Sequence, residues 1–233
     1  MRSSADRSIM SNALGIGIAS GAYALSFGAI AVASGLSVWQ AQVLSLGMFT
    51  GASQFAMIGV LGAGGTAVAA VATAALLGAR NGLYALTLTS TLGLRGWRRI
   101  VGAHFMIDET TAMALAAAPD KVASRRAFWT TGLSIFVLWN LGTIIGALGA
   151  SLLGDPKALG LDAAIPAAFL ALLWPRLRNR DAIAIAVAGA LVAIILTPLT
   201  SPGIPVLCAA GVAIIVGLAT WRRGTSMTPE GTP

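Results

Sequence analysis

Four ionisable side chains lie in stretches of the sequence that are otherwise almost entirely apolar. Arg80 is the only charged residue between positions 40 and 94, and Asp108 and Glu109 follow His104 in the next apolar stretch. A buried charge is costly unless a partner or water neutralises it. The opposite signs therefore predict that Arg80 pairs with one of the two acids.

The two acids are not expected to face the same partner. Adjacent residues on a helix point about 100 degrees apart, so one of Asp108 and Glu109 would balance Arg80 while the other changes protonation state. His104 lies four residues before Asp108 and would share its helix face. Two simpler interpretations stay open, namely an ion pair that only locks two helices and a histidine that is a satisfied interior side chain.

The sequence offers no set of residues typical of an enzyme active site. Ser53, in the stretch GASQF, would need a histidine partner to act as a nucleophile, but His104 is the only histidine and no GxSxG occurs. The single cysteine, Cys208, lies in an apolar run, where a small buried hydrophobe is expected. We predict that the protein is not an enzyme and holds neither a cofactor nor a metal.

The elements that must position these residues are membrane helices. Of the 233 residues 57% are hydrophobic and 10% are charged, whereas soluble proteins carry about 25% charged residues. The net charge of +7 comes from short Lys and Arg clusters beside apolar runs, which favours positive-inside anchoring over nucleic-acid binding. We expect a single integral membrane domain over 1–233, with short polar tails at 1–8 and 222–233.

The apolar runs limit the number of membrane crossings. A spanning helix needs about 20 residues, so the chain is predicted to be an all-α polytopic transmembrane helix bundle with six to eight membrane segments. Arg80, Asn81 and Gly82 interrupt the third run, so we predict broken or re-entrant helices around 66–94 and 100–118. The runs cover approximately residues 9–33, 39–61, 66–94, 100–118, 127–153, 163–175, 182–200 and 203–221.

Positive charge allows three layouts of these runs. If all of them cross and the N-terminus is cytoplasmic, the arginines at 95–99 lie outside together with Lys157. If the third and fourth runs are both re-entrant, only Lys157 lies outside. If the N-terminus is external and only the fourth run is re-entrant, Arg2 and Arg7 join Lys157 outside. Each layout places the C-terminal arginines in the cytoplasm, and the choice stays open.

Glycine pairs with a spacing of four predict close contacts between helices, because small residues let two helix backbones approach. Such pairs occur in three of the apolar runs. They are Gly17 with Gly21, Gly47 with Gly51, and Gly142 with Gly146.

Longer stretches of the chain carry a family resemblance. The sequence reads GLSVWQAQVLSLGMFTGASQFAMIGVL from Gly35, ARNGLY from Ala79 and IDETTAMAL from Ile107. Later segments, AFWTTGLSIFVLWNLGTIIGALGAS and LGLDAAIPAAFLALLWPRL, fit the same pattern. With these motifs the chain resembles the AzlC family, the large subunits of bacterial branched-chain amino acid exporters.

The resemblance implies a multi-pass transporter in the bacterial cytoplasmic membrane. It would export branched-chain or other hydrophobic amino acids, driven by protons, together with a small AzlD-like membrane protein. Where the family commonly reads NLRH, this chain has GARN at 78–81. Both polar flanks of the arginine therefore differ, which would alter the choice of amino acid.

An amino-acid substrate suggests roles for the charged residues. A carboxylate needs a cation or a helix N-terminus, and an ammonium group needs an acid or carbonyl oxygens. Arg80, or a half-helix that starts near Asn81, would face the carboxylate. Asp108 or Glu109 would face the ammonium group or carry a proton.

Two uncharged residues complete the candidate site. Ser53 and Gln54 would line it, or would serve only as a contact between helices. The alternative for the whole protein is a structural or regulatory membrane subunit that transports nothing.

Overall fold

The computed structural model describes residues 2–152, 170, 173–174, 177–178 and 180–224. Within these residues every regular element is a helix, so the prediction of an all-α protein is confirmed there. Most of the apolar run predicted at 163–175, and the C-terminal tail from residue 225, lie outside the described residues.

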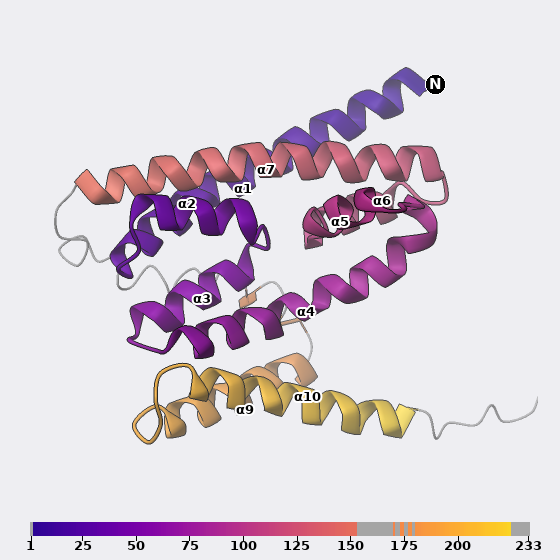
Figure 1. Cartoon of the computed structure of the whole chain (residues 1–233). Helices are drawn as coiled ribbons and strands as arrows, with labels where there is room; N and C mark the ends of the chain where they lie inside the picture. Colours follow the sequence, from indigo (N-terminus) through magenta and orange to yellow (C-terminus); the bar gives the residue numbers. More distant parts are fainter. Residues whose placement is uncertain (1, 153–169, 171–172, 175–176, 179, 225–233) are drawn as a thin grey trace, which may run out of the picture.

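Three long helices form the frame of the bundle (Figure 1). They are α1 (Arg2–Ala33), α4 (Ala67–Leu92) and α7 (Lys121–Leu152). Each is long and apolar enough to cross a membrane, since a helix rises about 1.5 Å per residue and the hydrocarbon core is about 30 Å thick. α1 and α7 lie side by side and run in the same direction, whereas α4 runs in the opposite direction.

Glycines let α1 and α7 approach backbone to backbone. A Cβ atom on Gly142 would collide with the carbonyl oxygen of Gly21, and one on Gly146 would collide with that of Leu25. The glycine pairs predicted in these two helices therefore lie at their contact. The third predicted pair does not form one, because a Cβ atom on Gly47 would meet nothing within 4 Å.

The second apolar run is a pair of half-helices instead of one span. α2 (Val38–Gly47) and α3 (Ala52–Gly62) are separated by a break that ends at Gly51, whose φ of 60° is unfavourable for residues with a side chain. The Gln54 side chain accepts a hydrogen bond from the Gly51 N–H at 3.1 Å and so restarts the helix. From the break, both half-helices extend toward the end of the bundle where α1 finishes (Figure 1).

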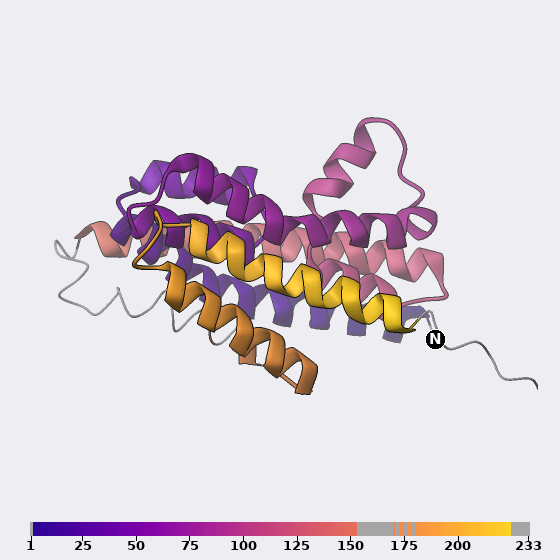
Figure 2. The same ribbon diagram turned by 90° about the horizontal axis from the view of Figure 1, so that it is seen from below.

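The fourth apolar run is broken, as predicted. α5 (Trp97–His104) and α6 (Asp108–Ala116) meet at a short break, where the Thr110 hydroxyl accepts from the Ile107 N–H at 3.0 Å. Both halves extend from this break toward the end of the bundle where α7 begins (Figure 2). Each pair therefore dips into the bundle and returns to the end from which it came.

The helix predicted to break at Arg80 is continuous. α4 runs without interruption from Ala67 to Leu92, so the prediction of a broken or re-entrant helix around 66–94 is wrong. One interior glycine costs a helix only about 1 kcal/mol relative to alanine, so Gly82 does not end it. Arg80 does not end it either, because a side chain on another helix neutralises its charge.

The two breaks meet in the middle of the bundle. The ring of Phe49, before α3, lies edge-on to the ring of Phe105, before α6, with centroids 5.8 Å apart. Phe136 of α7 packs against both rings, at 5.2 Å from Phe49 and 5.4 Å from Phe105. Both phenylalanines stand two residues before the N-cap of the half-helix that follows. The same local arrangement thus occurs twice, and aromatic contact joins the two copies.

Basic residues collect at one end of the bundle. Arg126 of α7 forms an ion pair with Asp6 of α1, and the Arg125 Nε donates to the Thr91 carbonyl of α4 at 2.9 Å. These contacts bring the start of α1, the start of α7 and the end of α4 together, so the arginine cluster at 95–99 lies at this end as well (Figure 1).

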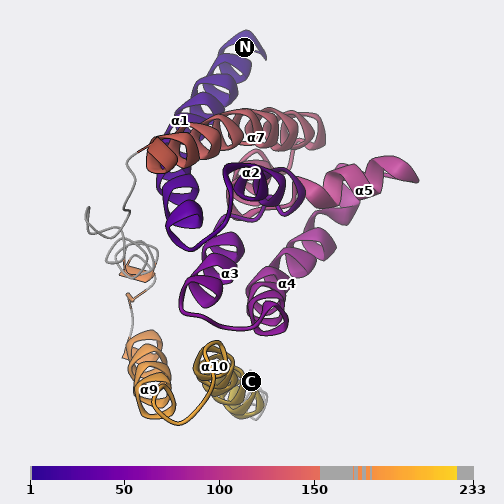
Figure 3. The same cartoon turned by 60° about the vertical axis from the view of Figure 1, so that its left-hand side comes forward.

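The last two described helices form a hairpin. α9 (Arg180–Leu196) and α10 (Ile204–Gly224) pack against each other, and α10 contacts α4 on the side away from α1 (Figure 3). They match the apolar runs predicted at 182–200 and 203–221. Within the described residues α1, α4 and α7 are the helices that meet both the length and the hydropathy expected of a span, so the number of six to eight membrane segments stays a prediction.

Candidate functional site

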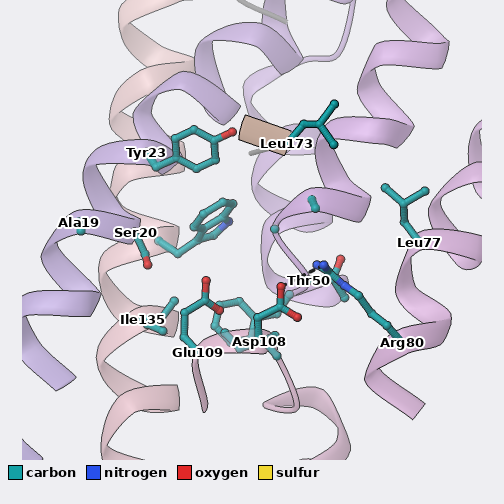
Figure 4. A pocket seen from close by; sticks show the side chains of 15 residues that line it. Ala19, Ser20, Tyr23, Thr50, Leu77, Arg80, Asp108, Glu109, Ile135 and Leu173 are labelled. Carbon is teal, nitrogen blue, oxygen red and sulfur yellow. Dashed lines mark ion pairs between the residues drawn. The ribbon is translucent and has the colours of Figure 1, made fainter. Parts of the chain in front are cut away.

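A cavity of about 520 Å³ lies where the α2–α3 break meets α6 and the long helices (Figure 4). Its walls come from α1, the break, α4, α6 and α7, and from Leu173. Apolar side chains form much of the wall. The residues with polar side chains are Ser20, Tyr23, Thr50, Arg80, Asp108, Glu109 and Trp139.

Arg80 and Asp108 form an ion pair across this cavity. The distance from Arg80 Nη1 to Asp108 Oδ2 is 3.0 Å, and the side chains are 27% and 29% exposed. Asp108 occupies the first turn of α6, where the helix dipole favours a negative charge. The expected pairing of opposite charges is present, and Asp108 is the acid that makes it. Because α4 carries the arginine and α6 the aspartate, the pair links two helices that face each other.

Glu109 points into another part of the same cavity. Figure 4 shows its carboxylate on the side of Ser20 and Ile135, whereas the Asp108 carboxylate lies toward Arg80. The adjacent acids therefore diverge, as their positions on a helix require. Asp108 pairs with Arg80, whereas Glu109 lies on the side of α1 and α7.

Ser53 and Gln54 lie behind the cavity wall. Both are buried on α3, and the Ser53 hydroxyl lies 3.5 Å from the point where a Cβ on Gly78 of α4 would stand. Gln54 accepts from the Gly51 N–H, and its Nε2 donates to the Leu44 carbonyl at 3.3 Å. The structure thus places the two residues at helix contacts, while the backbone just before them lines the cavity.

His104 and Asn81 also lie outside the set of residues that line the cavity. The expected shared face of His104 and Asp108 is wrong, because His104 ends α5 and Asp108 begins α6 beyond the break. The imidazole packs among aromatic rings, with centroids 5.9 Å from Phe49 and 5.8 Å from Phe136. The Asn81 Oδ1 is buried on α4 and has no donor among the described residues.

The sequence analysis did not identify four residues with polar side chains that line the cavity, namely Ser20, Tyr23, Thr50 and Trp139. Trp139 is 5% exposed and contacts Tyr23, with ring centroids 6.2 Å apart. One signal was available, because Trp139 is the only tryptophan in the middle of an apolar run, whereas the others stand near run ends where indoles prefer the interface. Ser20, Tyr23 and Thr50 carried no comparable signal.

Comparison with known sequences assigns the family. Residues 15–153 match the family model described as AzlC protein. The chain belongs to the AzlC family. The matched region runs from α1 to the end of α7, so it contains every residue that lines the cavity except Leu173.

Relatives of this AzlC protein are described as membrane proteins. An uncharacterized membrane protein of Archaeoglobus fulgidus is 33% identical over 192 residues, or 81% of this chain and 84% of that protein. The inner membrane protein YgaZ of Escherichia coli is 29% identical over 198 residues, or 81% of this chain and 79% of YgaZ. A membrane protein of Helicobacter pylori is 30% identical over 128 residues, and the match covers 54% of this chain and 56% of that protein. The chain thus spans little more than half of the Helicobacter relative, and no solved structure matches it.

Proposed function

We propose that this AzlC protein is a transporter that exports branched-chain or other hydrophobic amino acids across the bacterial cytoplasmic membrane, together with an AzlD-like subunit. The observation that carries the proposal is the cavity inside a bundle of membrane helices, which contains one cation and two acids. The apolar side chains Leu77, Ile107 and Ile135 in its wall suit an aliphatic substrate side chain. Charged residues at membrane depth are typical of substrate and proton pathways.

Glu109 is the residue that couples transport to protons in this proposal. Its carboxylate lies in the cavity without facing Arg80, so it can bind the ammonium group of the substrate. Protonation removes the charge that binds ammonium. Proton and substrate therefore compete for one carboxylate and move in opposite directions, which is the requirement for export driven by an inward proton gradient.

Two groups of helices supply the movement. α2 is tied to α7 by hydrogen bonds from Gln42 Nε2 to Asn140 Oδ1 at 3.0 Å and between the Ser45 and Thr143 hydroxyls at 3.1 Å. α3 instead packs against α4. Rotation of α3 and α4 about the α2–α3 break, relative to α1 and α7, would open the cavity first to one side and then to the other.

The proposal predicts flux that depends on the proton gradient. In proteoliposomes that contain this chain with an AzlD-like subunit, leucine, valine and methionine are expected to show saturable flux, and a polar amino acid is not. Removing the pH gradient removes the driving force, and replacing Glu109 with Gln removes the exchangeable proton. Either change should therefore lower leucine flux at least tenfold. Uptake of radiolabelled amino acids into these proteoliposomes, prepared with an acidic interior, measures this.

The outcomes of the flux experiment separate the two functions considered. No flux of any amino acid through folded protein would contradict transport and favour the structural or regulatory subunit. Flux that persists in Glu109→Gln with its gradient dependence intact would contradict only the coupling role. Flux without the AzlD-like subunit would remove that partner from the proposal.

The cytoplasmic side is proposed to be the basic end of the bundle, because positive charge favours that side. In a Cys208→Ser background, Arg98→Cys is expected to react with a membrane-impermeant maleimide only from the cytoplasm. Ala63→Cys, in the α3–α4 connection at the opposite end, should react only from outside. The reversed pattern would contradict the orientation, and reaction of both cysteines from one side would contradict α4 as a membrane span, since α4 is the only helix between them.

A further inference from the structure

The start of α3 lies at the cavity wall. Gly51 and Ala52 line the cavity wall. The first bonds of the helix run from the N–H groups of Gln54 and Phe55 to the Gly51 carbonyl, at 3.0 and 3.2 Å. The N–H groups of Ala52 and Ser53 are left without an acceptor among the described residues. They add to the positive end of the α3 dipole.

Two side chains beside this helix start also lack partners. Trp139 is 5% exposed and lines the same cavity, yet its indole Nε1 is buried and has no acceptor in the described part of the chain. The Thr50 hydroxyl, on the same wall, is likewise buried without a partner there. A buried donor that stays unpaired costs free energy. A ligand that accepts from both side chains would remove this cost.

Gly51 keeps the backbone open at this point. Its φ is 60°, and a Cβ atom built on it would stand 3.8 Å from Trp139 Cη2. The indole ring therefore lies directly against the N-cap of α3. A larger residue at Gly51 would strain the backbone and fill space between the helix start and the indole.

Arg80, the cation in the cavity wall, already pairs with an acid of the protein. Arg80 pairs with Asp108 at 3.0 Å, so its charge is largely balanced within the protein, and Glu109 adds a second negative charge to the cavity wall. A negative ligand group bound at the start of α3 does not have to compete with Asp108 for Arg80. This location differs from the expectation based on Arg80 and Asn81, because α4 has no helix start at that point.

We infer that the start of α3 is the carboxylate subsite of the cavity. The carboxylate accepts hydrogen bonds from the Ala52 N–H group, the Thr50 hydroxyl and the Trp139 indole N–H. The inference rests on the proposed function in taking an aliphatic amino acid as the ligand. It assigns the two ends of that ligand to opposite walls, with the carboxylate at α3 and the ammonium group at Glu109.

Binding of three related probes tests this subsite. L-leucine has both charges, 4-methylpentanoate lacks the ammonium group, and leucinamide lacks the carboxylate. Trp139→Phe and Thr50→Val each remove one donor and preserve most of the side-chain shape. Each variant is expected to bind leucine and 4-methylpentanoate about tenfold more weakly, as for a lost hydrogen bond to a charged group. Leucinamide affinity should change less than twofold.

The matched control is Thr73→Val. Thr73 also has a buried hydroxyl without a partner among the described residues, but it does not line the cavity. Calorimetry on the full chain in detergent should show wild-type affinities for all three probes in this variant. The thermal unfolding midpoint shows whether each variant is folded. If Trp139→Phe does not fold, Thr50→Val alone decides the outcome.

Several results would overturn the subsite. Unchanged leucine affinity in folded Trp139→Phe and Thr50→Val would do so, and the proposed function would survive because wild-type protein still binds leucine. Equal affinity of the wild-type protein for leucine and leucinamide would also overturn it, since the carboxylate would then not be recognised. Failure of the wild-type protein to bind any of the probes would overturn both the subsite and the amino-acid substrate.

Discussion

Replacing Arg80 with alanine is expected to lower leucine flux at least a hundredfold and to destabilise the folded protein. The change leaves Asp108 charged in a cavity with Glu109 nearby and no cation in the described cavity wall. Breaking a buried ion pair by removing one partner costs about 3 to 5 kcal/mol, and because both side chains are partly exposed we expect about 2 kcal/mol here. Flux in proteoliposomes and unfolding in detergent measure the two effects.

A double variant distinguishes an ion pair that is needed for transport from one that only holds α4 and α6 together. Arg80→Gln with Asp108→Asn removes both charges, so it should recover most of the stability that Arg80→Ala loses, because no uncompensated charge remains at the pair. We expect its flux to stay low, since α4 and α6 are no longer linked by charge. Recovery of flux along with stability would contradict the functional role and leave the pair as a lock between α4 and α6.

Replacing Gly146 with alanine is expected to cost about 3 kcal/mol or more of stability. The new Cβ atom would collide with the backbone of Leu25 on α1, and a backbone cannot move aside as a side chain does. α1 and α7 would have to separate, and they carry the Ser20 and Trp139 walls of the cavity. Denaturant unfolding followed by tryptophan fluorescence measures the loss.

The control lies one turn further along the same helix. A Cβ atom on Gly149 would meet nothing within 4 Å. Gly149→Ala should therefore change stability by no more than about 0.5 kcal/mol, or raise it slightly through better helix propensity. Equal destabilisation by Gly146→Ala and Gly149→Ala would show that helix propensity, and not the contact with α1, decides the effect.

Residue type and local spacing determined several properties of this protein. The composition predicts a helical membrane protein, and the positive-inside pattern fits the basic end where α1, α4 and α7 meet. The glycine pairs of α1 and α7 predict their close contact, because a missing side chain acts locally. The opposite charges predict an ion pair, since an isolated charge at that depth is costly.

The break between α5 and α6 was predicted, but only the tertiary structure decided that α4 is continuous and that the second apolar run is broken. Arg80 indicated a break in α4, but Asp108 on another helix neutralises its charge, so the backbone of α4 keeps its hydrogen bonds. The break before α3 gave no sequence signal, because Gly51 and Gln54 are also compatible with one apolar helix. In the folded protein Phe49 of this break packs against Phe105 of the other break, and that contact between distant parts of the chain has no local sequence pattern.

The candidate site was likewise only partly predictable from the sequence. The sequence determined that Arg80, Asp108 and Glu109 belong together, but the direction in which each side chain points depends on how α6 sits against α4 and α7. Trp139 and Thr50 joined them only through packing, because a tryptophan or threonine in an apolar run carries no charge that demands a partner. Charges are predictable from a sequence because their cost is local, whereas uncharged donors become a site only when folding leaves them buried and unpaired.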